Sequence, residues 1–124
     1  MSGVVFLAVC LAGGLGAVLR MLVDGWVKSL VGASLPWATA VINVSGSLAL
    51  GLVTGLATSH GLTPEVQAAV GTGLLGGYTT FSTASVEAFR LVQVKRWNAS
   101  LVYAFGMILL GVVAAGCGLW IGTM

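Results

Sequence analysis

Four long apolar segments, separated by short polar connections, make up almost the whole chain of 124 residues. They cover about residues 4–23, 35–57, 66–90 and 99–121. Each segment has roughly the 20 residues that an α-helix needs to cross the hydrocarbon core of a bilayer. The pattern predicts an all-α membrane protein in which residues 1–124 form a single domain of four transmembrane helices.

The composition supports this prediction. Hydrophobic residues make up 58% of the chain and charged residues 6%, and the mean hydropathy is +1.08, outside the range of soluble globular proteins. Most charges and both prolines lie in the connections, residues 24–36, 59–65 and 92–98, which we expect to be short loops. No Lys or Arg precedes the first segment, so we expect it to be retained as a span and not removed as a signal peptide.

The stretch "GGYTTFST", from Gly76 to Thr83, interrupts the third segment with two glycines and five hydroxyl side chains. Helix propensity is poor from Gly76 to Thr80, about halfway along the segment. Broken helices at that depth commonly build ion sites, because their freed backbone groups need partners. We therefore predict a third helix that is broken near its middle at an ion site. The alternative is a glycine hinge whose hydroxyl groups bond back to the preceding turn.

Polar side chains also recur along one face of the second segment. They are spaced four, four and seven residues apart, so they stack on one side of a helix: Thr39, Asn43, Ser47 and Thr54. Such a stripe either forms hydrogen bonds between helices or lines a hydrated path. The central amide of Asn43 favours the path, because it is costly in a membrane without partners.

Three ionisable residues border the predicted spans. Arg20 and Arg90 lie near span ends, where their side chains can snorkel to the interface. Glu87 lies four residues after Thr83 and therefore on the same helical face. This spacing indicates a carboxylate that points toward a hydrated cavity, with an ion pair to Arg90 as the alternative.

Small residues spaced four apart occur in all four segments. In membranes such pairs let helix backbones approach closely, and we expect tight packing here, between subunits as well as within one. The pairs are Gly13 with Ala17, Gly51 with Gly55, Gly73 with Gly77, and Gly118 with Gly122.

The candidate chemistry is that of a passage and not of a catalyst. The sequence has no metal-ligand cluster, no nucleophile with a base, no phosphate loop and no basic stripe for nucleic acid, so an enzyme is not expected. A path lined by an amide, hydroxyl groups and Phe81, with arginine at its mouth, offers hydrogen-bond donors and the positive edge of a phenyl ring. These groups suit a small anion.

The motifs that carry this chemistry resemble those of the Fluc (CrcB) family of fluoride channels. They are "GGLGAVLR" at residues 13–20, "NVSG" at 43–46 and "GGYTTFST" at 76–83, and the likeness extends over essentially the whole chain. The resemblance implies a bacterial plasma-membrane channel that lowers cytoplasmic fluoride by passive efflux. It also implies two four-helix subunits inserted antiparallel, with two narrow pores.

The resemblance further implies roles for individual residues. A structural sodium ion at the dimer centre would be held by backbone carbonyls that map to Gly76 and Thr79. The implied anion pathway comprises Asn43, Phe81, Ser82, Thr83, Glu87, Tyr103 and Arg20.

The chain also departs from the family pattern. Ala84 stands where a second phenylalanine is expected, and Met107 and Gly111 stand where hydroxyl residues are usual. All five Lys and Arg residues belong to the first and third segments or to the connections that follow them, which favours one fixed orientation. We therefore expect an oppositely oriented, homologous partner subunit, with one pore impaired; the alternative is a divergent homodimer.

Two readings from other classes stay open at this point. A small multidrug-type antiporter also has four short helices, but it needs an acidic residue within the first span, and residues 4–19 contain none. The other reading is a packing or regulatory membrane subunit that has no pore of its own.

Overall fold

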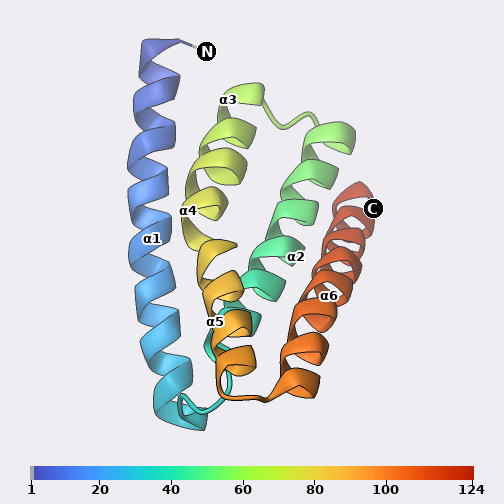
Figure 1. Cartoon of the computed structure of the whole chain (residues 1–124). Coiled ribbons are helices and arrows are strands. Elements are labelled where there is room, and N and C mark those ends of the chain that lie inside the picture. Colours follow the sequence, from blue (N-terminus) through green and yellow to red (C-terminus); the bar gives the residue numbers. More distant parts are fainter. Residues whose placement is uncertain (1) are drawn as a thin grey trace.

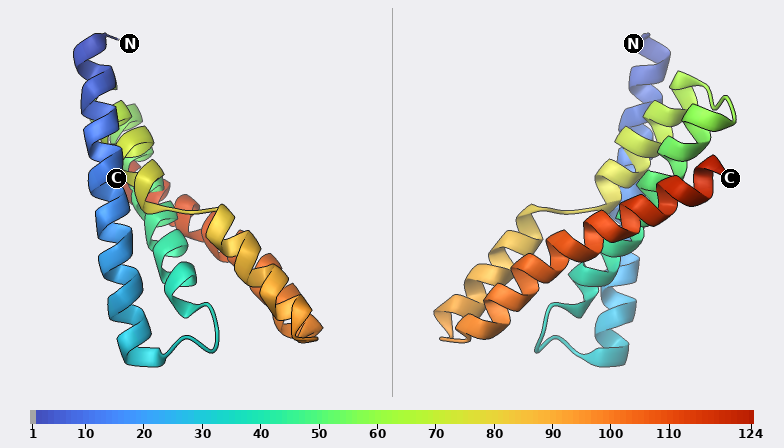
Figure 2. Two further views of the ribbon diagram at one scale, coloured as in Figure 1. Left: turned by 60° about the vertical axis from the view of Figure 1, so that its left-hand side comes forward. Right: turned by 90° about the vertical axis from the view of Figure 1, so that its right-hand side faces the viewer.

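The computed structural model describes residues 2–124, and its regular structure is entirely helical in that range, as predicted. The elements are α1 (Gly3–Val31), α2 (Trp37–Ser59), α3 (Pro64–Gln67), the π-helix η1 (Ala68–Leu75), α4 (Gly76–Tyr78), α5 (Ser82–Gln93) and α6 (Trp97–Thr123). The chain runs up and down, so the α1–α2 and α5–α6 connections lie at one end of the molecule (Figure 1). Figure 2 shows α5 and the adjoining part of α6 inclined away from α1.

Three helices, α1, α2 and α6, are long and apolar enough to cross a membrane. The remaining predicted span, 66–90, is divided among α3, η1, α4 and α5. Large apolar side chains cover the outside of the molecule; Phe6 is 62% exposed and Val102 is 72% exposed. A protein that presents so much apolar surface is stable in lipid and not in water, and the chain is therefore a membrane protein.

Helix α1 is longer than predicted. The sequence pattern placed its end near residue 23, but the helix continues to Val31, so the first part of the expected loop at 24–36 was wrong. Asp24 and Lys28, one turn apart, form an ion pair of 2.9 Å on the helix surface. The helix ends at Gly32, whose φ of 77° is a conformation that side chains disfavour.

Helices α2 and α6 pack backbone against backbone. A Cβ atom at Gly51 would collide with the carbonyl oxygen of Ala115, and one at Gly118 would collide with the carbonyl oxygen of Leu48. Gly55 and Gly122 meet in the same way one turn further on. The predicted small-residue pairs of these two helices thus face each other within one chain.

Helix α1 packs in the same manner on η1 and α4. A Cβ atom at Gly77 would collide with the backbone of Gly13, and one at Gly16 with the carbonyl oxygen of Leu74. This contact explains Gly77 better than helix breaking does, because Gly76 and Gly77 both remain helical; it does not involve Gly76, whose Cβ position is open. The non-helical backbone begins only at Thr79, which is extended with φ −80° and ψ 162°.

A polar hollow at the helix interruption

The interruption between α4 and α5 is held by one side chain of α2. The Asn43 amide nitrogen donates to the carbonyl of Thr80 at 2.7 Å, and the N–H of Thr80 donates to the amide oxygen of Asn43 at 2.8 Å. A single amide therefore satisfies both polar groups of a residue that has left the helix. Thr80 is buried, so these two bonds replace contacts that water does not supply.

Two neighbours of Asn43 complete the contact with the interruption. The hydroxyl groups of Ser45 and Tyr78 are 3.0 Å apart. Gly46 has no side chain where the methyl group of Thr79 lies, and a Cβ atom there would collide with it. The motifs "NVSG" and "GGYTTFST" thus form one structural unit, although more than 30 residues separate their starting positions.

The Thr80 hydroxyl binds the first turn of helix α5, which begins at Ser82. It accepts a hydrogen bond from the N–H of Thr83 at 3.2 Å and donates to the Thr83 hydroxyl at 3.1 Å. A side-chain acceptor in this position satisfies one of the free N–H groups of the first turn. The helix therefore restarts directly after the interruption.

A hollow of about 540 Å³ opens beside the interruption, between α2, α5 and α6. Phe81, at its rim, is 86% exposed. The polar groups of the hollow are hydroxyl groups, an amide and backbone, and none of the described residues in its wall is charged. The residues that line the hollow include Asn43, Ser47, Gly76, Thr79, Phe81, Ala84, Tyr103, Met107 and Gly111.

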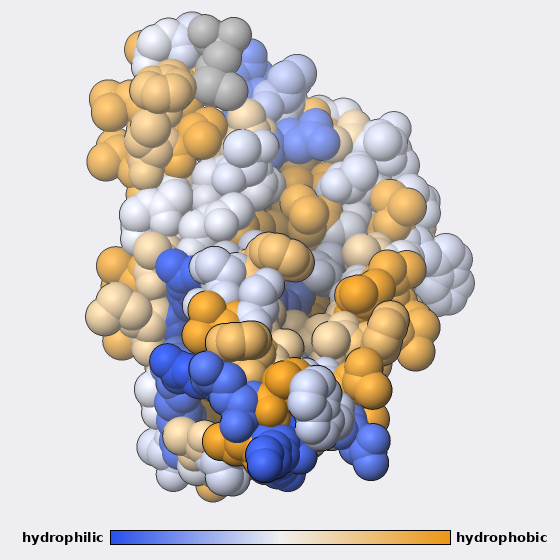
Figure 3. Space-filling model, in the orientation of Figure 1, coloured by the Kyte–Doolittle hydropathy of each residue, from blue (hydrophilic) through white to orange (hydrophobic). Residues whose placement is uncertain are grey.

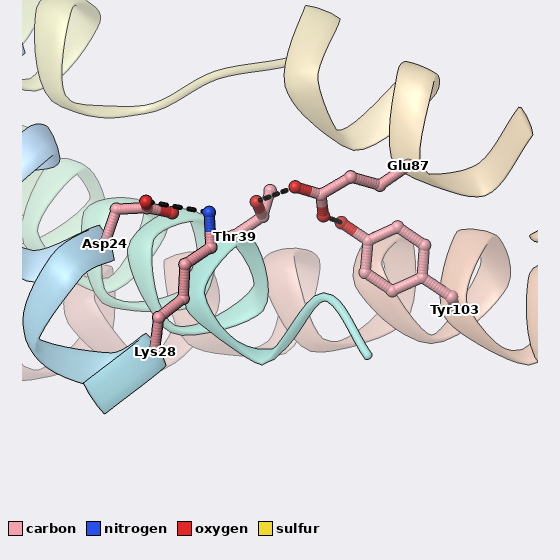
Figure 4. Close-up of polar contacts among 5 residues, drawn as sticks. All are labelled: Asp24, Lys28, Thr39, Glu87 and Tyr103. Carbon is pink, nitrogen blue, oxygen red and sulfur yellow. Dashed lines mark hydrogen bonds and ion pairs between the residues drawn. The ribbon is translucent and has the colours of Figure 1, made fainter. Parts of the chain in front are cut away.

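A carboxylate borders this hollow and is held by two hydroxyl groups (Figure 4). Thr39 donates to one oxygen of Glu87 at 2.9 Å, and the Tyr103 hydroxyl donates to the other at 3.3 Å. Thr39 is 1% exposed, so its hydroxyl has no alternative partner in solvent. The expected alternative, an ion pair between Glu87 and Arg90, does not occur in the described part of the chain.

The predicted pathway residues divide into three groups. Asn43, Phe81 and Tyr103 line the hollow. Ser82 and Thr83 adjoin it through Thr80, and Glu87 through Tyr103. Arg20 lies in α1, which packs on η1, α4 and α2, and it is absent from the wall of the hollow.

The structure adds two residues that the sequence reasoning did not single out. Ser45 and Tyr78 lie inside the quoted motifs, but no spacing in the sequence indicates that their hydroxyl groups meet. Thr39 and Ser47 from the predicted stripe do reach polar surroundings, at Glu87 and at the hollow. Thr54 instead donates back to the carbonyl of Leu50.

Several backbone carbonyls at the interruption lose their helical partners, and those of Gly76 and Thr79 are among them. In an unbroken α-helix the carbonyl of Gly76 would accept the N–H of Thr80. The carbonyl of Thr79 would likewise accept the N–H of Thr83. Both N–H groups bond elsewhere, to Asn43 and to the Thr80 hydroxyl, and neither carbonyl accepts a hydrogen bond within the described range. Both residues line the hollow, where free carbonyl oxygens suit a hard cation.

Comparison with known proteins agrees with this architecture. Residues 7–119 match the sequence model of the family described as CrcB-like protein, Camphor Resistance (CrcB). The chain belongs to the CrcB family. It is 55% identical over its full length to the "Fluoride-specific ion channel FluC 1" of Leifsonia xyli, of which it covers 90%. Over 93% of its length it is 47% identical to the "Fluoride-specific ion channel FluC 2" of Cutibacterium acnes, of which it covers 94%.

A more distant CrcB relative carries a similar name. Over 94% of its length the chain is 38% identical to the "Fluoride-specific ion channel FluC" of Thermus thermophilus, of which it covers 92%. These names describe ion channels and not enzymes, in agreement with the lack of catalytic motifs in the sequence. Membership of the CrcB family decides against the antiporter.

Proposed function

We propose that this chain is a subunit of a fluoride-selective channel that lowers cytoplasmic fluoride by passive efflux. The observation that carries the proposal is the uncharged hollow at the helix interruption, in a chain whose relatives are named fluoride-specific channels. The Ser47 hydroxyl and the second N–H of the Asn43 amide have no acceptor among the described residues and can replace part of the water shell of a small anion, and Phe81 offers the positive edge of its ring. We expect a larger anion such as chloride to be excluded where a second subunit narrows the hollow to a pore.

Efflux through such a channel needs no pump. Hydrogen fluoride crosses a bilayer as a neutral molecule, ionises in a less acidic cytoplasm and is trapped there as F⁻. A negative-inside membrane potential drives the anion outward by about 2.3 kcal/mol per charge for each 100 mV. The protein has only to provide a selective path.

The proposal includes a fourth crossing and an antiparallel dimer. Helices α3, η1, α4 and α5 together would form the third of four spans, broken at Thr79 and Thr80. The dimer is supported by the exposure of Phe81, because a ring that is 86% exposed on one subunit is available to line a pore completed by another. The membrane would be the bacterial plasma membrane.

Gly76 and Thr79 would hold a structural sodium ion through their carbonyl oxygens. Two carbonyls from each of two subunits would give the ion four oxygen ligands, and the ion would satisfy backbone groups that otherwise lack partners. When bound, the ion would supply a positive charge near the anion path and a link between the subunits.

The sodium proposal is tested by the dimer as well as by transport. Complete replacement of Na⁺ by a large organic cation is expected to weaken the dimer on size-exclusion chromatography and to reduce fluoride flux. Thr79→Ser keeps the carbonyl and the hydroxyl and is expected to behave as the wild type. A dimer and a flux that are both indifferent to sodium would contradict the site.

A second candidate is a channel built with a different, homologous partner of opposite orientation. Three residues that depart from the family pattern, Ala84, Met107 and Gly111, all line the hollow and offer no side-chain donor to an anion. A pore that depends on them would be impaired, and a companion subunit would supply the missing groups.

The distribution of positive charge favours the same arrangement. The five Lys and Arg residues belong to α1, to α5 or to the α5–α6 connection. In Figure 3, hydrophilic residues gather at the end of the molecule that holds the α1–α2 and α5–α6 connections. Such a bias favours a cytoplasmic location for this end and both termini outside. The residues are Arg20, Lys28, Arg90, Lys95 and Arg96.

Fluoride efflux from liposomes tests the proposed function. The chain is reconstituted alone and together with a homologous subunit, and fluoride and chloride release are measured in parallel. We expect fluoride release without chloride release. Absence of fluoride release in both preparations would overturn the channel, whereas release only with the partner would select the second candidate. Labelling of a C-terminal tag from each side of the membrane then reads the orientation directly.

A further inference from the structure

A second, smaller hollow lies further along α2, on the other side of the interruption from Glu87. It measures about 220 Å³ and is lined by Leu50, Val53, Thr54, Gln67, Gly71 and Thr72. None of these residues belongs to the pathway that the family resemblance implies. Its polar side chains come from α2, from the end of α3 and from η1.

Two of the polar side chains that line the second hollow have no hydrogen-bond partner among the described residues. Thr54 donates back to the carbonyl of Leu50 at 2.9 Å. By contrast, the Gln67 amide and the Thr72 hydroxyl make no side-chain hydrogen bond within residues 2–124. The side-chain groups of this hollow without a hydrogen bond are therefore an amide and a hydroxyl.

The π-helix explains why these two side chains share one wall. Gln67 and Thr72 are five residues apart, which places them on different faces of an ordinary α-helix. In a π-helix the hydrogen bonds join residues five apart, so such residues lie above one another. Helix η1 begins directly after Gln67 and includes Thr72. The wider turn thus brings both donors to the hollow, and π-turns frequently occur at functional sites.

The two hollows adjoin each other. Leu50 and Gly71 belong to the walls of both. The side chain of Leu50 passes 3.6 Å from the place where a Cβ atom of Gly71 would stand, which is ordinary van der Waals distance, so Leu50 packs against η1 at the junction of the two hollows. Along α2 the order is Asn43, Ser47, Leu50 and Thr54, in which an apolar side chain separates polar positions.

We propose that the second hollow continues the anion route beyond the interruption, with Gln67 and Thr72 as donors to a small anion and Leu50 as the apolar constriction between the hollows. This inference rests on the proposed channel function. It gives the route a second polar binding position for the anion, here called the second station, toward the end of the molecule that has no Lys or Arg. An apolar constriction between two wetted stations would require the anion to shed water at Leu50.

Thiol labelling tests whether the hollow is wet, independently of transport. Cys10 and Cys117 are exposed, so both are first replaced by alanine. Gln67→Cys and Thr72→Cys are then expected to react with a membrane-impermeant, water-soluble thiol reagent. Val102→Cys, on the outer surface of α6, is the lipid-facing control and is expected to react far more slowly. Equal, slow reaction at all three positions would overturn the proposal.

Flux measurements test whether the wet hollow lies on the route. Gln67→Leu with Thr72→Val removes both donors and is expected to lower fluoride flux about tenfold, as for the loss of modest hydrogen bonds. Leu50→Trp is expected to abolish flux. Leu48→Trp, two residues away and in neither wall, is the matched control and should conduct normally.

The outcomes separate this inference from the proposed function. If the wild type does not conduct fluoride, the channel itself is wrong. If the wild type conducts and both Leu50→Trp and the double variant conduct equally well as folded protein, the second station is wrong and the channel stands. Loss of flux in Leu50→Trp but not in Leu48→Trp, together with rapid labelling at Gln67→Cys, supports the station.

Discussion

Helix α2 makes two unlike contacts, and the difference separates what holds this protein together from what we expect to carry an ion. Toward α6 it presents Gly51 and Gly55, which touch backbone and leave no room for any side chain. Toward the interruption it presents Asn43 and Ser45, which make hydrogen bonds to a peptide group and a tyrosine. Shape alone determines the first contact, whereas the second depends on which atoms donate and accept.

This comparison predicts different consequences for substitutions in the two contacts. A change in the glycine contact forces two helices apart and so affects folding first. A change in the polar contact leaves the helices in place but alters the groups at the hollow, and so affects transport first.

The largest effect on stability is expected for Gly118→Ala. The new Cβ atom would collide with the backbone of Leu48, so α2 and α6 must separate, at a cost of about 3 kcal/mol. Gly116→Ala in the same helix is the control, because no atom lies within 4 Å of its Cβ position. The control should gain up to about 1 kcal/mol from helix propensity. Thermal unfolding in detergent measures both, and equal melting temperatures would contradict the proposed role of the glycine contact.

An intermediate effect is expected for Thr39→Val. The substitution keeps the volume but leaves one oxygen of Glu87 without its 2.9 Å donor, and hydrogen bonds to charged groups contribute about 1.5–3 kcal/mol. Thr58→Val is the matched control, because Thr58 donates only to Gly55 in its own helix. The free energy of unfolding and the fluoride flux should both fall for Thr39→Val and remain near wild type for Thr58→Val. Identical behaviour of the two variants would show that the Glu87 contact contributes nothing.

The smallest effect is expected for Tyr78→Phe. The lost contact with Ser45 is exposed, and the Ser45 hydroxyl keeps its bond to the carbonyl of Ile42 at 3.1 Å. We expect a loss of about 0.5 kcal/mol in unfolding free energy and little change in flux. A loss as large as that of Thr39→Val would mean that the polar contact acts as a whole and not chiefly through its buried members.

The sequence predicted the simple helices well. Predicted and observed bounds of α2 and α6 differ by two residues at each end, because long apolar runs with polar flanks define them. The end of α1 was missed because hydropathy falls where Asp24 and Lys28 appear, although the two charges pair on the helix surface. Such a pair is compatible with a helix that extends into the interface.

The glycines of segment 66–90 predicted a break there, but the interruption between α4 and α5 has a different local cause. Glycines suggested where the helix would break, yet Gly77 serves the close approach of α1, and the backbone departs at Thr79. The departure depends on Asn43, which is distant in sequence and provides both hydrogen bonds to Thr80. Local propensity contains no information on that partner. The π-helix was not anticipated either, since no periodicity in the sequence marks it.

Fluoride flux through Asn43→Asp tests most directly whether the polar contact of α2 serves the anion. A carboxylate cannot donate to the Thr80 carbonyl, and it brings a negative charge to the wall of the hollow. With equal amounts of folded protein in liposomes, we expect fluoride efflux at least about 100-fold below wild type, since a loss of about 3 kcal/mol corresponds to that factor. Efflux equal to that of the wild type would contradict the account.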